Sequence, residues 1–210
     1  MAQHLGLKNH DTGLVGEPGG VESDGHGTLI AHESSWVNKN RNRISKAEIE
    51  TRLLAAYGAN KLIWAPGIKN QDITDYHIDS LARFTGAGRM IIQLIDDPDP
   101  SDPWQIVPYD THDIIAANRT STGRKFDITV IPDPDKRRVK SNDFVASYAN
   151  YYVCNGAVIA AQFGDRRTDK AAKRALKQHY PGREIITLNV DPLGELGGGI
   201  HCATQQQPKL

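Results

Sequence analysis

The chain has 210 residues and a mass of 23.1 kDa, which is enough for a domain with a sizeable core and excludes a disulfide-stapled mini-protein. Its 25 Lys and Arg balance 25 Asp and Glu, so net charge offers no attraction to nucleic acid or to an anionic bilayer. No apolar run approaches the roughly 20 residues of a membrane span, and the first residues lack the basic and apolar regions of a secretory signal. We therefore expect a cytoplasmic protein with neither nucleic-acid nor membrane partners.

The first third of the chain predicts a hairpin, a helix and a strand. Two short apolar stretches flank an Asp-Gly-His-Gly turn, which indicates a hairpin over residues 20–31. Ser45 and Glu48 have the spacing of a capping box, and apolar residues then recur at helical period, so residues 46–57 should form a helix. Residues 61–65, which end at a Pro-Gly pair, predict a strand.

The same order of elements returns in the rest of the chain. In chain order we expect a strand over residues 89–95, a helix over 105–118, a strand over 126–131, strands over 144–153 and 157–161, a helix capped by Thr168, and a strand over 184–188. Roughly two and a half copies of a ββαβ unit fit this order. The periodicity therefore predicts a mixed α/β chain built from repeats.

The two cysteines have different surroundings. Neither has a second Cys at the spacing of a zinc site or a redox dithiol, so we expect free thiols and no metal site. Cys154 has the setting of a small packed residue at a strand end. Cys202 follows three glycines and His201, so its thiol could be exposed and reactive, although a glycine-rich tail with a chance cysteine is an equally good interpretation.

A histidine and a carboxylate alternate in the segment 74–79. If this segment is extended, His77 and Asp79 point to the same side and could act on one substrate. A His-x-Asp pair is common by chance, however, and a solvated polar loop is its more frequent explanation. The pair alone leaves both explanations open.

Three carboxylates surround paired glycines near the N-terminus. Carboxylates are natural receptors for a guanidinium group because they accept its fork of N–H donors in pairs. Glu17 and Glu22 are candidates for this role. Asp24 is better explained as a turn residue, since a glycine follows it.

Five segments together carry a longer pattern than these motifs taken singly. They are Glu17 to Thr28, Asn38 to Arg43, Thr74 to Phe84, Ser147 to Asp165, and the ending from Leu196 to Pro208 with its Gly-Gly-Gly-Ile-His-Cys-Ala-Thr-Gln-Gln-Gln-Pro sequence. The chain thereby resembles the agmatine deiminase and Porphyromonas-type peptidylarginine deiminase family of guanidino-group modifying enzymes. The resemblance implies an α/β fold of repeated ββαβ modules, the five-bladed pentein propeller, here incomplete with about three of five blades. Residues 1–210 would then form a single partial catalytic domain.

The resemblance also implies roles for particular residues. Cys202 would be the nucleophile, His77 the general acid and base, Asp79 a catalytic carboxylate that also grips the guanidinium, and Glu17 and Glu22 would bind substrate. Cys202 and His77 should then share one pocket.

The reaction implied by the resemblance is hydrolysis of a guanidino group through an amidino-cysteine intermediate, without metal or cofactor. The substrate would be agmatine, giving N-carbamoylputrescine and ammonia on a route to putrescine, or free or peptidyl arginine, giving citrulline. Amidino transfer to an amine is the runner-up chemistry within the superfamily. A truncated, inactive or partner-dependent remnant is the alternative from another class, and a generic Cys-His hydrolase ranks below both.

The chain departs from the family pattern in sequence and in length. Pro18 and Tyr76 replace glycines, Ser80 replaces an asparagine, and Ala161 replaces a proline. Tyr76 could either narrow the pocket or occupy a position that requires positive φ. Because family members are much longer, we expect the hairpin over 20–31 to lie at an open boundary with part of its apolar face uncovered, through which two copies of the chain could associate.

Overall fold

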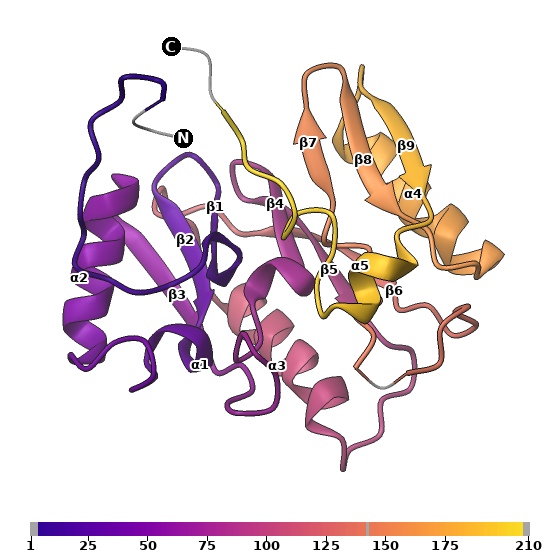
Figure 1. The fold of residues 1–210 in the computed structure, drawn as a ribbon, viewed down its shortest axis with the longest axis horizontal. Helices are drawn as coiled ribbons and strands as arrows, with labels where there is room; N and C mark the ends of the chain where they lie inside the picture. Colours follow the sequence, from indigo (N-terminus) through magenta and orange to yellow (C-terminus); the bar gives the residue numbers. More distant parts are fainter. Residues whose placement is uncertain (1–3, 142, 208–210) are drawn as a thin grey trace.

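Three ββαβ units follow one another in the computed structural model, which describes residues 4–141 and 143–207 (Figure 1). The first unit comprises β1 (Val21–Ser23), β2 (Thr28–His32), α2 (Lys46–Tyr57) and β3 (Lys61–Ala65). The second unit comprises β4 (Ala82–Gly86), β5 (Arg89–Leu94), α3 (Pro103–Ala117) and β6 (Asp127–Pro132). The third unit comprises β7 (Tyr152–Cys154), β8 (Ala157–Ala161), α4 (Arg166–His179) and β9 (Glu184–Leu188). In each unit the first two strands pair antiparallel, and a helical crossover makes the third strand parallel to the second. The expected repeated α/β fold is confirmed.

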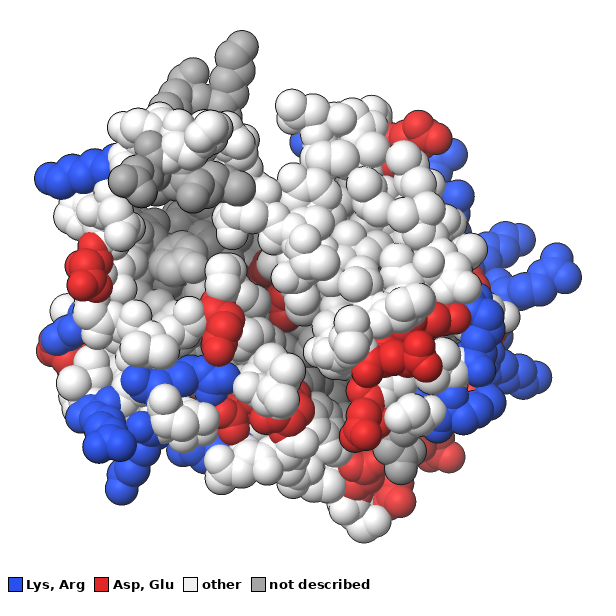
Figure 2. All heavy atoms as spheres, in the orientation of Figure 1, with Lys and Arg blue, Asp and Glu red and all other residues white. Residues whose placement is uncertain are grey.

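Four short helical segments complete the described fold. They are η1 (Pro18–Gly20), α1 (Glu33–Trp36), η2 (Ile78–Ser80) and α5 (Asp191–Glu195). None of the helices within residues 4–141 and 143–207 has the length and apolar character needed to cross a bilayer. Basic side chains lie on both flanks of the face drawn in Figure 2, while acidic ones gather below its centre.

Side-chain caps determine where the long helices begin. As predicted, the Ser45 hydroxyl accepts a hydrogen bond from the Glu48 amide at 3.2 Å, and α2 ends at Gly58 in the left-handed conformation. The cap expected at Thr168 is wrong, because Asp165 caps α4 by accepting from two backbone amides of its first turn. A carboxylate there also favours the positive end of the helix dipole, and Thr168 is itself fully buried.

One strand prediction, in the third unit, fails in part. Of the expected strand over 144–153, only Tyr152 and Val153 are extended into a ladder, as part of β7. The preceding segment is turned back on itself, because the Ser147 hydroxyl accepts hydrogen bonds from the amides of Ala149 and Asn150. The sequence analysis also missed β4, which forms a hairpin with β5 around Gly88 at φ 67°.

The expectation of an uncovered hairpin over 20–31 is wrong. All five residues of β2 and two of the three residues of β1 are buried. The second unit closes over β1, since the Phe84 amide of β4 donates a hydrogen bond to the Glu22 carboxylate at 3.1 Å. Burial of the hairpin therefore comes from its neighbour within the same chain.

The tail that follows α5 runs back across the molecule toward the first two units (Figure 1). It is held there by polar contacts, of which the shortest joins His201 Nδ1 to the Asp79 carboxylate at 2.7 Å. Pro208, the last residue of the family-like ending, lies outside the described residues. The tail thus brings Cys202 beside η2, although the two are distant in sequence.

Candidate active site

Four of the five predicted site residues, all except Glu22, come from three segments that meet at η2. Glu17 immediately precedes η1, His77 precedes η2, and Asp79 lies within η2. His77 Nε2 is 3.1 Å from Glu17 Oε2, and Cys202 Sγ is 3.7 Å from Asp79 Oδ2. Asp79 lies in a 3-10 turn, so the alternation expected of an extended segment does not apply, yet Glu17, His77, Asp79 and Cys202 still gather around this turn.

Asp79 is a buried carboxylate with incomplete hydrogen bonding. Its residue is only 1% exposed. Oδ2 contacts His201 and the Cys202 thiol, whereas Oδ1 has no hydrogen-bond partner within the described part of the chain. The Gly19 backbone lies against this carboxylate so closely that a Cβ there would be 2.7 Å from Oδ2. An unsatisfied buried carboxylate oxygen is costly, so this geometry favours an external N–H donor.

Asn150, which the sequence analysis did not select, holds Cys202 in place. Its Nδ2 donates to Cys202 Sγ at 3.2 Å, and its Oδ1 accepts from the backbone amide of His201 at 2.9 Å. Partial burial of the thiol, together with the negative charge of Asp79, raises the pKa of Cys202. Without a bound cation the thiol is therefore favoured over the thiolate.

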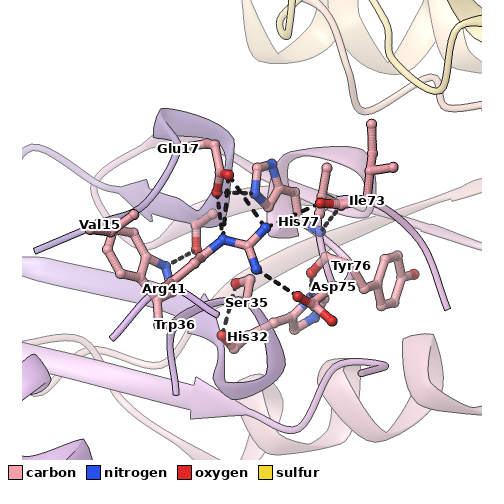
Figure 3. Close-up of polar contacts among 12 residues, drawn as sticks. Val15, Glu17, His32, Ser35, Trp36, Arg41, Ile73, Asp75, Tyr76 and His77 are labelled. Atoms are coloured by element: carbon pink, nitrogen blue, oxygen red, sulfur yellow. Dashed lines mark hydrogen bonds and ion pairs between the residues drawn. The ribbon is translucent and has the colours of Figure 1, made fainter. Parts of the chain in front are cut away.

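Arg41 is the second residue that sequence reasoning missed. Its guanidinium, with a side chain only 6% exposed, bridges two carboxylates: Nε lies 3.0 Å from Glu17 Oε2 and Nη1 lies 2.6 Å from Asp75 Oδ2. Figure 3 shows the Glu17 carboxylate between Arg41 and His77. Partial burial acts to raise the pKa of Glu17, but the hydrogen bonds and charge of Arg41, aided by His77, outweigh it and hold the pKa below its ordinary value. Arg41 lies in the segment 38–43, whose resemblance to the family pattern is the sequence signal that points to this residue.

Glu22 lies deeper than the other carboxylates. It is 7% exposed, and its Oε1 is 2.6 Å from Arg83 Nε. Burial raises the pKa of Glu22, against the opposing effect of Arg83. The carboxylate is thus already occupied by Arg83 and by the amide of Phe84. Cys154 lies in β7, where its thiol contacts the Ala157 carbonyl.

Tyr76 occupies a position of positive φ and does not narrow the site. Its φ is 66°, and its ring is tilted against His32 at 4.7 Å and meets Trp104 edge-on at 5.0 Å. Figure 3 shows the ring directed away from His77. Ser80, another departure from the family pattern, donates its hydroxyl to the His77 carbonyl at 2.8 Å and so supports the η2 turn.

The family model described as Porphyromonas-type peptidyl-arginine deiminase matches residues 1–208. The chain belongs to this family. An agmatine deiminase of Medicago truncatula is 34% identical over 94% of this chain and 58% of its own length. A putative agmatine deiminase of Mycoplasma mycoides is 35% identical over the same shares. The chain therefore spans less than two thirds of these relatives.

Solved structures of the family share the fold. An agmatine deiminase of Enterococcus faecalis superposes with a TM-score of 0.86 at 24% identity, over 99% of this chain and 61% of that one. An agmatine deiminase of C. jejuni with substrate bound superposes with a TM-score of 0.79 at 27% identity, over 95% and 57%. The three ββαβ units correspond to part of the deiminase fold.

Proposed function

We propose that this chain carries the Cys-dependent site of a deiminase that hydrolyses a guanidino group of agmatine or an arginine-type substrate. The observation that carries the proposal is the buried Asp79 carboxylate, which has an oxygen without a hydrogen-bond partner in the described chain and lies beside the Cys202 thiol. A guanidinium group would supply this carboxylate with paired N–H donors and a positive charge. The deiminase names of the curated relatives support the same reaction class.

The first half of the reaction forms a covalent intermediate on Cys202. The charge of Asp79 disfavours the Cys202 thiolate; a bound cation offsets that charge and so favours the thiolate. The thiolate attacks the central guanidino carbon, and the C–N bond to one amino group then breaks. His77 protonates the departing group, which leaves as ammonia, and an amidino-thioether remains on the sulfur.

The second half hydrolyses that intermediate. His77, now neutral, takes a proton from water, and the resulting hydroxide adds to the amidino carbon. The C–S bond breaks and the Cys202 thiolate is released. The added hydroxyl loses its proton to solvent and becomes the carbonyl of the ureido product, and His77 is left protonated. An amine in place of water would give amidino transfer, which the identity of the product distinguishes.

Glu17 and Arg41 orient the histidine in this scheme. Glu17 accepts a hydrogen bond from His77 Nε2, while His77 Nδ1 has no such partner among the described residues. The free nitrogen is then available for proton transfer, and a carboxylate behind an imidazole stabilises its protonated form. Arg41 acts as a positioning residue that holds Glu17 from the side opposite His77.

Glu22 links β1 to β4 next to the site. Its ion pair with Arg83 and its hydrogen bond from β4 join the first and second units next to η2. We assign it to this framework rather than to the residues that contact the substrate.

A ureido assay on the purified chain tests the proposal. Agmatine, arginine and an arginyl peptide are supplied separately, and agmatine binding to Cys202→Ser is measured by calorimetry. We expect Cys202→Ser to abolish ureido formation, Asp79→Asn to weaken agmatine binding at least about tenfold through loss of a charged hydrogen bond, and Cys154→Ser to change neither. Turnover that survives Cys202→Ser, or the absence of both turnover and Asp79-dependent binding, would overturn the proposal.

A partner-dependent module is the second candidate, and the length of the chain favours it. The chain covers 58% of the Medicago relative, so further segments of such a protein could be needed for turnover. Asp79-dependent binding of agmatine without ureido formation would support this candidate.

A further inference from the structure

A cavity of the described chain is lined by Ser80 of η2 and Glu195 of α5, among other residues. Its volume is about 1490 Å³, and its lining comes mainly from the segments 70–76, 102–108, 133–137, 143–147 and 195–197. Glu17, His77, Asp79 and Cys202 do not line it. Its occupant need not be the deiminase substrate.

The cavity wall is strongly acidic. Five of its carboxylates make no ion pair with an Arg or Lys of the described chain, and the cavity holds one basic residue, Arg137. These five are Asp72, Asp102, Asp133, Asp143 and Glu195. Figure 2 shows acidic side chains gathered near α5, which borders the cavity. The field inside therefore favours a cation.

Asp133 is the most enclosed of the five. Gln93 Nε2 donates to its Oδ1 at 2.5 Å, and its other oxygen has no hydrogen-bond partner in the described chain. Burial raises the pKa of Asp133 to about 6, against the opposing effects of the Gln93 hydrogen bond and the positive charge of Arg137. A cationic group at this carboxylate would offset the cost of its burial.

Tyr76 adds an independent sign of a ligand. Its side chain lines the cavity and is more than nine-tenths buried, yet no described residue hydrogen-bonds to its hydroxyl. Burial and the charges of Asp133 and Asp72 raise the pKa of the phenol, so it stays protonated and directs a polar group without a protein partner into the acidic space. This tyrosine stands at φ 66°, where the family pattern has glycine, and is fixed between His32 and Trp104.

We propose that this cavity binds a small organic diamine or polyamine cation. One ammonium group would donate to Asp133 and to the Tyr76 hydroxyl oxygen, and the methylene chain would lie along Leu81, Pro108 and Phe144 of the wall. Ammonium groups separated by methylenes match carboxylates separated by apolar side chains. A metal ion fits less well, because no group of three or more His, Cys, Asp or Glu side chains in the described chain is arranged to ligate one.

Calorimetric titration with spermidine tests this proposal. The titration uses the Asp79→Asn protein, so that cation binding at the catalytic carboxylate does not contribute, and it is independent of deiminase activity. We expect one spermidine site. Its affinity should fall at least about tenfold when Asp133→Asn, which removes a charged partner, is added to the Asp79→Asn protein. It should fall about three- to tenfold when Tyr76→Phe, which removes only the hydroxyl, is added instead. Asp110→Asn, an exposed carboxylate of α3 outside the cavity, is the matched control.

The alternatives give distinct results. A nonspecific counter-ion effect predicts equal losses for Asp133→Asn and Asp110→Asn, and displacement of spermidine by Mg²⁺ at equal ionic strength. Either result, an unchanged affinity in Tyr76→Phe, or no binding to the parent protein, would overturn the proposal.

Discussion

One added methyl group at Gly19 should disable the site while the chain still folds. An alanine Cβ there would lie 2.7 Å from Asp79 Oδ2, 2.8 Å from Cγ and 2.9 Å from Oδ1. Gly19 does not have the positive φ that strains other residues. The effect of Gly19→Ala is therefore steric and falls on a single carboxylate.

The size of the effect follows from these distances. Ordinary contact to a Cβ begins at 3.4 Å, so the closest pair must separate by 3.4 minus 2.7, that is 0.7 Å. Asp79 cannot swing away freely, because it is 1% exposed and held at 2.7 Å by His201. A displacement near 1 Å costs a reacting group about a hundredfold in rate, and overpacking costs about 1–3 kcal/mol of stability.

Agmatine binding and ureido formation are the measurements. We expect Gly19→Ala to lose about 30- to 100-fold in one or both, with a lower melting temperature but a cooperative transition. Gly86→Ala is the matched control, because its Cβ meets only the end of the flexible Arg89 side chain. If the two alanine variants bind and react alike, the close contact between η1 and Asp79 has no functional role.

Three further predictions address other groups. Burial lowers the pKa of His32 from 6.5 to about 4. The contribution of the neutral imidazole to stability is therefore complete above about pH 6.5, and about 3 kcal/mol of it is lost as the pH falls from there through 4. The free energy of unfolding in urea should differ less between pH 7 and pH 4.5 for His32→Gln than for the parent protein, and an equal difference would contradict this. The pKa of Glu17, measured by ¹³C carboxyl NMR, should rise in Arg41→Met, and in Arg41→Lys it should lie between the values of Arg41→Met and the parent protein. An unchanged pKa of Glu17 in Arg41→Met would refute the role of the Arg41 contact. Chloroacetamidine, a cationic alkylating agent, should modify Cys202 faster than Cys154, and equal rates would mean that no cation site adjoins Cys202.

Local signals in the sequence were sufficient for elements that their own residues specify. The helix over 46–57 follows from a capping box, an apolar stripe and a glycine at its end, and each of these acts within a few residues. The segment 144–151, expected as part of a strand, follows a different course. Its actual course depends on the Ser147 hydroxyl and on Gln93 of β5, which accepts from the Tyr148 amide across the molecule.

The same division applies to the site. His77, Asp79 and Cys202 belong to segments with a recognisable pattern, so their convergence could be anticipated from family resemblance. The roles of Arg41 and Asn150 depend on contacts with residues 24 and 52 positions away, Glu17 and Cys202, which no local period reveals. Periodicity reports burial and turns, whereas a hydrogen bond between distant segments leaves no periodic signal.

The charges around η2 constrain which cation the site can hold. Glu22 and Arg83 form a buried pair that is neutral as a unit. Arg41 is shared between Glu17 and Asp75, so this group of three keeps one negative charge. Arg41 is itself a guanidinium held by two carboxylates, which demonstrates within the same chain how such a group is bound here.

Protonated His77, 3.1 Å from Glu17, would balance the remaining charge of that group. This is the form in which we propose that His77 begins the reaction, as the acid that protonates ammonia. Asp79 lies beside Cys202; its Oδ2 contacts His201, and its Oδ1 has no hydrogen-bond partner in the described chain. A monocation bound at Asp79 offsets the charge of that carboxylate and thereby favours the Cys202 thiolate, whereas a neutral urea product does neither. The electrostatics therefore favour binding of the substrate and release of the product at the same carboxylate.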